Sequence, residues 1–481
     1  MHAIMRYGSL NALLPTGSSI PSKAKIFAFV AMWLLVTASG GFVHAAGRPN
    51  LCDPLTYGAV ADGVTDNTVA IQTAIDACAA QGGGTVPFDS GIFLTGPFTL
   101  KSHILLRVNA GATILGTTDQ SRYVPAYIGT RYRPNEALIS AADATDVGII
   151  GNGTIDGQGA VTPPGVGAKS WYDLAHSATF PYASFPFAPS SNGLPRPWLV
   201  EFWNTDHVVV QGVHLQNSPM WTLVARYATD VTIAGISDSA PSTSANTDAV
   251  DVVSSSHVTI SNVNFASGDD DVAIKSGLPP TYQDPNAPPM PQAPSQFVTV
   301  ANATFTAGHG MSIGSEAING AHDILIKNVA LSGTSNGFRI KTGRDRGSHI
   351  QDITVQNLTM TNVKQPIVIN SYYPASSPPP CCEKPPFPAI TPTTPFVSNI
   401  TIQNLTATGA TSQSFISGLP ESWVLNVTLT NVTIGQASSS VKPMDLRYMS
   451  GTFSNVTVNP TTTGHNFQVD DGVSVVGESL P

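Results

Sequence analysis

Apolar and polar side chains alternate along many short segments of the chain. The pattern is clearest in six of them: HVTISNVNF (257–265), FVTVANATF (297–305), DILIKNVAL (323–331), DITVQNLTM (352–360), NITIQNLTA (399–407) and NVTLTNVTI (426–434). Period two is typical of β-strands, because successive side chains of a strand point to opposite faces. Where nothing is inserted, the copies recur every 23 to 29 residues, and weaker copies stand at 207–215 and 230–236. A repeat of this length indicates a solenoid, so we predict an all-β, single-domain parallel β-helix.

One asparagine recurs at a fixed place in the repeat. Several of its copies stand in N-x-T sequences, which can accept a glycan. We favour a structural role, because asparagine tolerates the left-handed backbone of a turn and bonds to nearby main chain. Stacked coils would then form an asparagine ladder from Asn262, Asn302, Asn328, Asn357, Asn404 and Asn431.

Three insertions interrupt the repeat, at about 158–195, 278–296 and 374–396. The last two are rich in proline and the first is polar and aromatic. Because none of them continues the strand pattern, we expect loops that project from the solenoid.

The start of the repeat region is expected to carry a cap, at about residues 52–90. Asp66, Asn67 and Thr68 precede VAIQTAIDACAA (69–80), whose apolar residues have helical spacing. This predicts a capped amphipathic helix. Such a helix would close the open end of the solenoid, where strand edges and core are otherwise exposed.

The first 46 residues have the pattern of a secretory signal peptide. Basic residues include Lys23 and Lys25, an apolar run covers 26–36, and small residues at 43–46 suit cleavage. The alternative is a membrane anchor, but an apolar run of roughly 11 to 14 residues is too short to span a bilayer. We predict a secreted, extracellular protein whose mature catalytic domain is 47–481, with no membrane segment in the mature form.

Charge and cysteine content narrow the class of protein. Only 11% of residues are charged and the formal net charge is −9, which argues against a nucleic-acid-binding protein. An acidic polymer would need a local basic site. An even number of cysteines allows disulfides in a secreted chain; Cys52 could pair with Cys78, while the pairing of Cys381 and Cys382 stays open. No cysteine or histidine has zinc spacing, and we expect no metal, no cofactor and a monomer.

The repeated asparagine also aligns charged residues of different coils. Counted from it, VAIK (272–275), SIGS (312–315) and FRIK (338–341) correspond, and Lys275 takes the phase of Lys341. Ala273 likewise takes the phase of Arg339, and Asn370 that of the two lysines. Asp269 takes the phase of His309.

The coil before adds a further carboxylate. If the valines of NTDAVDV (246–252) face the core, Asp248 takes the phase of Asp270. Adjacent strands lie about 4.8 Å apart, so these two carboxylates are expected to stack and hold one water. Asp269 lies next to them, whereas Asp271 has no partner of the same phase. We expect one surface cleft with carboxylates at one end, then a histidine, then two cations.

This arrangement suits inverting glycoside hydrolysis. One carboxylic acid protonates the leaving oxygen while an ionised carboxylate activates water on the opposite face of the sugar. Close like charges push pKa values apart and keep one acid protonated. Arginine can bind the carboxylate of an acidic sugar through two hydrogen bonds. Alone, GDD is more often a solvated turn or calcium loop and a single histidine more often structural, but their shared phase across four coils favours catalysis.

Four motifs stand in order at one-coil spacing: NTD (246–248), GDD (268–270), GHG (308–310) and RIK (339–341). Through them the chain resembles the polygalacturonase family of pectin-degrading glycoside hydrolases, over about residues 52–460. The resemblance implies a right-handed β-helix and inverting hydrolysis of α-1,4-linked galacturonate in polygalacturonate or pectin.

The resemblance also implies roles for the residues of these motifs. Asp269 would be the general acid, supported by His309, and Asp248 and Asp270 would position the water. The substrate would be bound by Arg339, Lys341, Asn246 and, by a looser match, Tyr373.

Two residues of the run 267–277 add to this pattern. Lys275 is expected to mark a further sugar subsite, because of its phase. Asp271 departs from many family members, where cysteine is frequent, and its added charge could raise the pKa of the acid.

The motif run from SGDDDVAIKSG (267–277) to KQPIVINSYY (364–373) resembles bacterial endo-acting members, so we favour endo action. The insertions could instead block one end of the cleft, as in exo-acting members. Other readings are a hydrolase of branched pectin, a calcium-dependent pectate lyase and a non-catalytic glycan-binding β-helix. Calcium takes 6–8 oxygen ligands, and the nearby His309, Arg339 and Lys341 suit it poorly.

Overall fold

A computed structural model describes residues 50–175 and 195–481. The expected signal peptide lies outside the described residues, as does much of the insertion at 158–195. Within the described ranges, no helix has the length and apolar character needed to cross a membrane. The helical elements there are short: η1 (Pro54–Tyr57), α1 (Thr68–Ala80), η2 (Gln120–Arg122), α2 (Trp171–Ala175) and η4 (Pro280–Tyr282).

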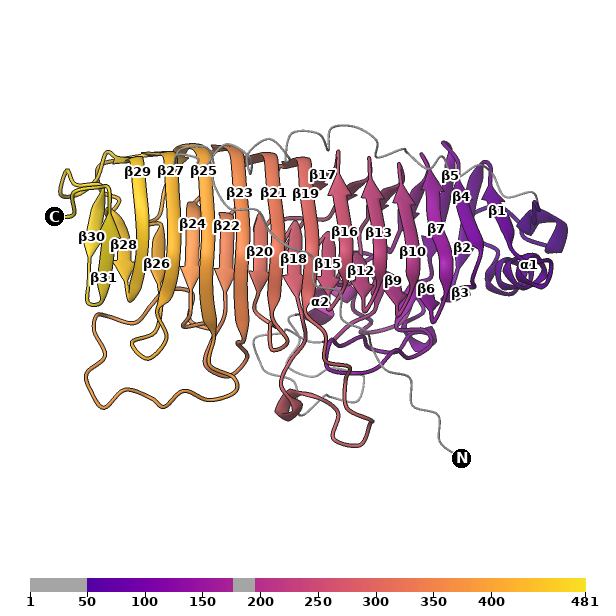
Figure 1. Cartoon of the computed structure of the whole chain (residues 1–481). Coiled ribbons are helices and arrows are strands. Elements are labelled where there is room, and N and C mark those ends of the chain that lie inside the picture. Colours follow the sequence, from indigo (N-terminus) through magenta and orange to yellow (C-terminus); the bar gives the residue numbers. More distant parts are fainter. Residues whose placement is uncertain (1–49, 176–194) are drawn as a thin grey trace, which may run out of the picture. The chain divides into compact units, whose positions relative to one another are not determined.

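Parallel strands stack coil upon coil from β1 to β31 (Figure 1). Among the described residues, the smaller sheet has twelve strands: β3 (Phe98–Leu100), β6 (Ala137–Ala142), β9 (Trp198–Trp203), β12 (Leu223–Arg226), β15 (Val250–Val253), β18 (Val272–Lys275), β20 (Met311–Gly314), β22 (Asn336–Lys341), β24 (Gln365–Asn370), β26 (Phe415–Ser417), β28 (Met444–Arg447) and β30 (Phe467–Val469). Each of these strands pairs only with its neighbours, which is the arrangement of a parallel β-helix.

In the described part of the chain, the larger sheet has nineteen strands, which form the other walls of the coils. They are β1 (Gly84–Phe88), β2 (Gly91–Thr95), β4 (Ile104–Val108), β5 (Ala112–Gly116), β7 (Thr145–Gly151), β8 (Thr154–Asp156), β10 (Asp206–Gln211), β11 (His214–Gln216), β13 (Thr229–Ala234), β14 (Ser237–Ser239), β16 (Ser256–Ser261), β17 (Asn264–Ala266), β19 (Ser295–Phe305), β21 (Ala321–Ser332), β23 (His349–Thr361), β25 (Phe396–Ala410), β27 (Val424–Gln436), β29 (Met449–Asn459) and β31 (Val473–Val476). The repeated segments all fall in this sheet.

Apolar side chains at matching positions of successive coils make the core. In the smaller sheet Val252, Ile274, Ile313, Ile340 and Ile369 are paired in register, and all five are fully buried. Burying one such side chain stabilises the fold by about 1.5–3 kcal/mol. The stack is continuous because the inward positions of each coil carry branched aliphatic residues.

The predicted asparagine ladder is present at one corner of the coils. Each amide nitrogen donates to the side-chain oxygen of the coil before it, for example Asn328 to Asn302 at 3.1 Å and Asn357 to Asn328 at 3.0 Å. These asparagines have φ near +55°, a left-handed conformation that asparagine tolerates well. The ladder extends one coil beyond the prediction, because Asn455 donates to Asn431 at 3.0 Å.

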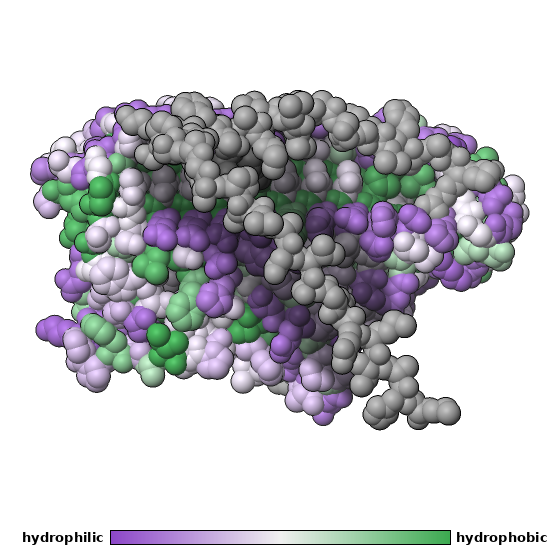
Figure 2. Space-filling view, viewed as in Figure 1, coloured by the Kyte–Doolittle hydropathy of each residue, from purple (hydrophilic) through white to green (hydrophobic). Residues whose placement is uncertain are grey.

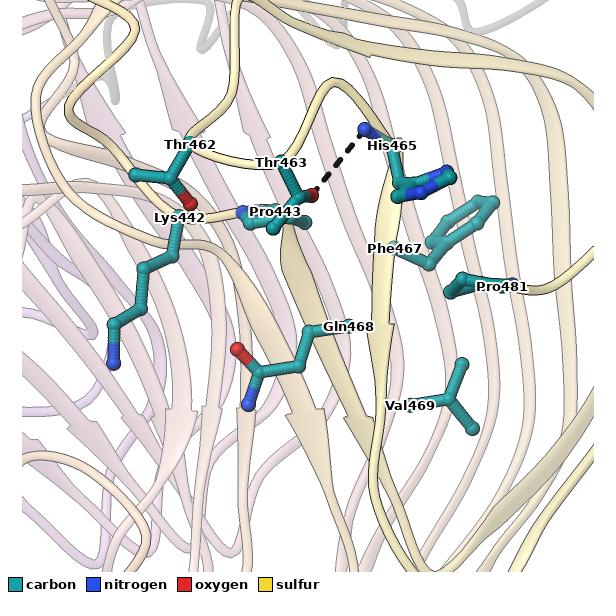
Figure 3. Close-up of a pocket in the computed structure, with 9 residues that line it drawn as sticks. All are labelled: Lys442, Pro443, Thr462, Thr463, His465, Phe467, Gln468, Val469 and Pro481. Atoms are coloured by element: carbon teal, nitrogen blue, oxygen red, sulfur yellow. Dashed lines mark hydrogen bonds between the residues drawn. The ribbon is translucent and has the colours of Figure 1, made fainter.

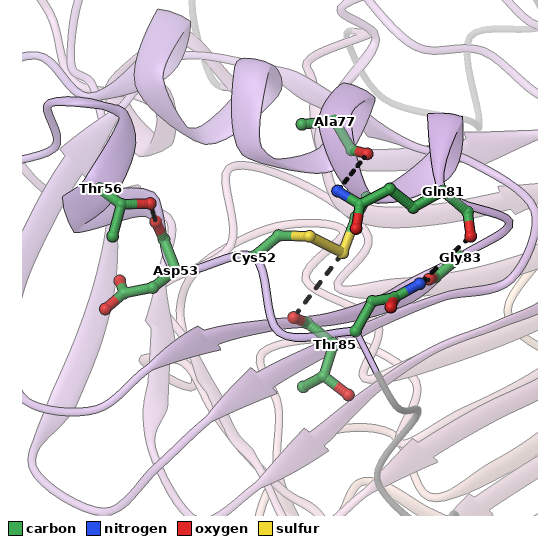
Figure 4. The surroundings of a disulfide bond; sticks show 9 residues. Cys52, Asp53, Thr56, Ala77, Gln81, Gly83 and Thr85 are labelled. Carbon is green, nitrogen blue, oxygen red and sulfur yellow. Dashed lines mark hydrogen bonds between the residues drawn. A yellow bond between two sulfur atoms is a disulfide. The ribbon is translucent and has the colours of Figure 1, made fainter.

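The predicted capping helix is α1, which packs against β1 and β3 at the N-terminal end of the β-helix (Figure 1). The backbone amide of Thr68 donates to Asp66 Oδ1 at 3.0 Å, so Asp66 satisfies an amide at the start of the helix. A disulfide joins Cys52 to the buried Cys78 of α1, with their Cα atoms 5.8 Å apart (Figure 4). Closing a loop of this length stabilises a fold by roughly 3 kcal/mol. Cys381 and Cys382 pair with each other.

The insertions at 278–296 and 374–396 are loops that project from the coils, as predicted (Figure 1). The first is held on one side by Tyr127, whose hydroxyl donates to Tyr282 O at 2.9 Å. On the other side, Tyr282 Oη donates to Asp345 Oδ2 at 3.0 Å. The second is held by an ion pair of 3.0 Å between Arg344 Nη2 and Glu383 Oε1. Both loops are therefore tied to the turns that follow the RIK strand.

Candidate active site

The four motifs lie on four adjacent strands of the smaller sheet. NTD precedes β15, GDD precedes β18, GHG precedes β20, and RIK ends β22. Val250 pairs with Val272, Val272 with Met311, and Ser312 with Arg339. The motif side chains therefore gather at the start of consecutive strands, with the cations slightly further along.

The strand register corrects one part of the predicted phase. Counting from the asparagine aligned SIGS (312–315) with the other strands, but the structure aligns MSIG (311–314). The corner before β20 is one residue shorter than its neighbours, so Asp270 rather than Asp269 is level with His309. Two other alignments are as predicted. Lys275 and Lys341 occupy the same position in their strands, with Gly314 between them, and Lys341 pairs with Asn370.

Asp270 is the centre of a charged cluster. Its side chain is fully buried; Oδ2 lies 2.7 Å from Lys341 Nζ, and Oδ1 is bonded to Arg339 Nη2. Ser312 Oγ donates to Oδ1 at 2.8 Å. Burial alone would raise the pKa of Asp270, but Lys341 and Arg339 outweigh it and hold the pKa well below its usual range. Asp270 is therefore an ionised carboxylate.

Asp269 contacts His309, although the two residues are not level in the strand register. His309 Nδ1 lies 2.8 Å from Asp269 Oδ1, and the His309 backbone amide donates to Asp269 O at 2.7 Å. The side chain of Asp269 is 20% exposed, whereas that of Asp270 is fully buried. Burial raises the pKa of Asp269, but the hydrogen bond and charge of His309 outweigh it, so the pKa lies below its usual range.

Asp248 is the carboxyl of this group whose pKa is raised. Burial is the main cause; the charges of Asp251, Asp269 and Asp270 add to it, against the opposing effect of Lys275. We expected repulsion to keep one acid protonated, and the pKa values are indeed pushed apart. However, the raised pKa in the free protein belongs to Asp248 rather than to Asp269, because His309 and Lys341 compensate the charge of Asp269.

The side chain of Lys275 is not exposed to solvent, as a residue of a further sugar subsite would be. Its residue is only 3% exposed, and Nζ lies 2.6 Å from Asp251 Oδ1 and 3.2 Å from Asp248 Oδ2. The ammonium also lies 3.6 Å from the centre of the Trp221 ring. The predicted sugar contact of Lys275 is wrong for this reason: the side chain points outward from the coil, but other residues cover it.

The remaining predicted substrate-binding residues lie beside the charged cluster. Asn246 has φ +57°. Its backbone amide donates to Asp269 Oδ2 at 3.3 Å, and its side-chain Oδ1 accepts from Arg196 Nη2 at 3.4 Å. The Tyr373 ring centre lies 5.8 Å from Lys341 Nζ and 5.5 Å from the Arg346 guanidinium carbon. The structure thus brings together all the predicted residues, with Lys275 buried beneath Asp248.

Three residues of the site were missed in the sequence. Ser312 bridges Asp270 and Arg339, whose Nε donates to it at 3.0 Å; it has the same phase as Arg339 in the register. Asp251 is the outward neighbour of Val252 in β15, so the alternation could have revealed it. Arg196 had no signal, because it follows an insertion and belongs to no repeat.

Arg196 supports the turn that carries NTD. The residue is fully buried, and it donates from Nη2 to Ala245 O at 2.6 Å and from Nε to Pro219 O at 2.9 Å. Burial lowers its pKa to about 10, so the side chain keeps its charge at neutral pH. That charge lies near Asp248 and Asp269 and offsets part of their repulsion.

A pocket of about 500 Å³ lies elsewhere, at the C-terminal end of the β-helix (Figure 3). Gln468 of β30 is among its lining residues and is four strands beyond β22 in the smaller sheet. At about 4.8 Å per strand, the pocket is too far from Asp270 to share its chemistry. On the face of the β-helix that Figure 2 shows, hydrophilic side chains gather across the middle.

The profile of "Glycosyl hydrolases family 28" matches residues 84–454. The chain belongs to this family. It is 28% identical over 432 residues to a protein named "Probable polygalacturonase" from Vitis vinifera, covering 86% of this chain and 81% of that protein. It is 31% identical over 314 residues to an "Endo-polygalacturonase" of Pectobacterium carotovorum subsp. carotovorum, covering 64% and 72%.

The fold is similar to that of a solved structure. The crystal structure of a hyperthermoactive exopolygalacturonase from Thermotoga maritima superposes with a TM-score of 0.66 at 24% identity, covering 89% of this chain and 92% of that chain. The predicted right-handed parallel β-helix and the resemblance to the polygalacturonase family are both confirmed. As a member of family 28, the protein is a glycoside hydrolase.

The donor atoms of the site fit this family better than they fit a calcium enzyme. Asp269, Asp270 and His309 are close enough to share one ion. However, Lys341 and Arg339 bond to Asp270, and Nδ1 of His309 bonds to Asp269. A divalent cation there would be repelled by two cations and would find few of the 6–8 oxygens that calcium takes.

Proposed function

We propose that the protein is a secreted polygalacturonase that cleaves the α-1,4 bonds of polygalacturonate or pectin by inverting hydrolysis, with endo action. The observation that carries this proposal is the charged cluster itself. Three carboxyls, Asp248, Asp269 and Asp270, stand on two adjacent coils, and Arg339 and Lys341 stand two coils beyond the second of these. Neutral sugars need no such pair of cations, whereas a uronate does.

The cations would bind the galacturonate carboxylate. Arg339 and Lys341 bond to Asp270 in the free protein, and their side chains are 16% and 12% exposed. An arriving carboxylate would compete with Asp270 for them, with Tyr373 beside Lys341. Arginine suits this role because its planar fork can make two parallel hydrogen bonds to a carboxylate.

Substrate binding would also prepare the general acid. Lys341 is one of the charges that lower the pKa of Asp269. The negative charge of a uronate carboxylate near Lys341 offsets that positive charge, which raises the pKa of a neighbouring carboxyl. Asp269 would thus gain its proton as the sugar binds. It would then donate this proton to the leaving glycosidic oxygen.

The nucleophilic water would be held between Asp248 and Asp270. Asp270 is ionised, so it can accept the proton of the water. Asp248 Oδ1 has no hydrogen-bond partner in the described part of the chain, which leaves an acceptor or donor for the same water. Water attacks the anomeric carbon from the face opposite to Asp269, the C–O bond to the leaving sugar breaks, and the product has the inverted configuration.

Endo action is the finer part of the proposal. It is supported by the likeness of the motif run to endo-acting members and by the named relative from Pectobacterium. Exo action is the second candidate, because the loops at 278–296 and 374–396 are tied to the turns next to the site. Either mode uses the same catalytic residues.

Product analysis of polygalacturonate digestion tests the function. We expect mixed oligomers early in the reaction and a saturated product whose anomeric configuration is inverted by proton NMR. Mono- or digalacturonate from the start would replace endo with exo action. An unsaturated, ultraviolet-absorbing product that disappears with a chelator would refute hydrolysis, and binding without any product would leave a glycan-binding protein. Methyl-esterified polymer should react more slowly, since it lacks the charge that Arg339 and Lys341 would bind.

Secretion and the monomeric state complete the proposal. Secretion rests on the pattern of residues 1–46, and amino-terminal sequencing of the protein from culture medium would test it. A sequence that begins near residue 47 is expected. Light scattering of the purified protein would test the monomer.

A further inference from the structure

We propose that Asp271 is an uncharged positioning residue, which donates a hydrogen bond to Ser267 and thereby holds the turn of Asp269 against the turn of His309. The inference rests on the proposed roles of Asp269 and His309. It differs from the expectation drawn from the sequence, in which Asp271 adds a negative charge next to the acid.

The two turns meet at the carbonyl oxygen of Asp269. This oxygen lies 2.7 Å from the backbone amide of His309 and 2.7 Å from Ser267 Oγ. Ser267 Oγ in turn lies 3.2 Å from Asp271 Oδ1. The backbone amide of Gly310 donates to Asp271 Oδ2 at 3.0 Å. One carboxyl group therefore touches both turns, with its two oxygens on different partners.

The number of hydrogens in this chain of contacts favours an uncharged Asp271. A carbonyl oxygen only accepts, and the hydroxyl of Ser267 has a single hydrogen. The shorter contact, to Asp269 O, takes that hydrogen. The contact between Ser267 Oγ and Asp271 Oδ1 then needs a hydrogen from the carboxyl. A neutral Asp271 satisfies every contact, whereas an ionised one would set two acceptors against each other.

The surroundings of Asp271 also favour the neutral form. The residue is fully buried, and in the described ranges no lysine, arginine or histidine forms an ion pair with it. Burial raises the pKa of its carboxyl well above the usual range and outweighs the hydrogen bonds from Gly310 and Ser267, which lower it; the neighbouring carboxyl of Asp238 in β14 also raises it. The other titratable groups near it are Asp269 and Asp270 in the same turn and His309 beside Gly310.

The turn of Asp269 and the turn of His309 are in close backbone contact. Gly308 has φ +87°, and a Cβ atom there would collide with Ser267 Oγ and with the carbonyl oxygen of Asp269. Glycine is thus required for the close approach of the two backbones. Because the His309 amide reaches Asp269 only in this arrangement, a loose contact between the turns would misplace the histidine that bonds to the acid.

Asp271→Asn tests the charge, because asparagine has the shape of a neutral carboxyl and can both donate to Ser267 and accept from Gly310. We expect kcat on polygalacturonate to stay within about twofold and the pH profile of kcat/KM to stay unchanged. If Asp271 is ionised, its removal takes away a negative charge that raises the pKa of Asp269. The limb of the profile above the optimum would then move to lower pH, and this result would overturn the proposal.

A second readout does not depend on activity. A buried carboxyl with a raised pKa stays protonated in the folded protein but ionises in the unfolded chain above about pH 4. Wild-type stability is therefore lost as pH rises from the unfolded pKa towards the folded one. The Tm of Asp271→Asn minus that of wild type should increase between pH 4 and 7. A constant difference would refute a neutral Asp271, even if the protein proved inactive on polygalacturonate.

Asp271→Ala and Ser267→Ala test the positioning. Each removes the link between the turns, and we expect kcat to fall by about 10- to 100-fold with little change in KM. The second variant serves if the first does not fold. Unchanged kcat in a folded Ala variant would show that the link does not place Asp269 and His309.

Discussion

Two corners of the β-helix use the same stacking geometry for opposite purposes. At one corner every coil presents an asparagine, from Asn262 to Asn455, and each amide bonds to the next. At the other, before β15, β18 and β20, the residues change from coil to coil and collect like charges. Identical neutral residues satisfy one another's hydrogen-bonding groups along the stack. Carboxylates at the same spacing repel, and cations from elsewhere must offset them.

The two corners also contribute to the stability of the fold with opposite sign. Each amide bond of the ladder contributes about 0.5–1.5 kcal/mol net. The carboxylates of the other corner are buried charges, which are costly unless they are paired. This contrast explains why the catalytic corner needs Arg196, Lys275, Arg339 and Lys341 around three carboxyls. The ladder needs no such support.

The largest expected effect lies at the catalytic corner, with Asp269→Asn. The amide keeps the shape but cannot supply an acidic proton, so kcat should fall by about 10²- to 10⁴-fold. Reducing-sugar release from polygalacturonate measures the change. Asp89→Asn, at a carboxyl that is 64% exposed, is the matched control. Full activity of Asp269→Asn would refute the assigned acid.

A smaller loss is expected where the catalytic corner is held together, with Lys275→Met. This change leaves Asp251 and Asp248 buried without their ammonium partner. Breaking a buried pair in this way typically costs about 3–5 kcal/mol, which urea unfolding would measure. Lys364→Met, at an exposed lysine, should change stability little. Equal stabilities of the two variants would mean that the carboxyls are accommodated without Lys275.

The smallest effect is expected at the ladder, with Asn328→Ala and Asn328→Gly. Both remove the amide bonds to Asn302 and Asn357, each worth about 1 kcal/mol. Alanine should lose roughly 1–2 kcal/mol more, because φ is positive there and glycine, unlike alanine, adopts it without strain. Thermal unfolding compares them with Asn264→Ala, at an exposed asparagine outside the ladder. Equal losses for alanine and glycine would contradict the strain argument.

The sequence was sufficient for the fold and for the motif residues of the site, but not for Ser312, Asp251 and Arg196 or for the finer placement of the site. The period-two alternation reports which residues face inward, so the alignment of VAIK (272–275) with FRIK (338–341) followed directly. The phase of His309 was off by one, because the number of residues in a corner varies between coils. Lys275 was placed on the outward face correctly, yet whether an outward side chain is covered depends on residues such as Trp221 from another coil.

The helix α1 and its disulfide have a consequence for the protein in concentrated solution. Parallel coils have no built-in end, since the last strand of a stack offers the same hydrogen-bonding edge as any other. Two uncapped molecules could therefore join end to end and grow into fibres. By packing on β1 and β3, with Cys78 joined to Cys52, α1 gives the stack a defined first coil. By fastening α1 to the chain before it, the disulfide helps to keep this end of the stack covered.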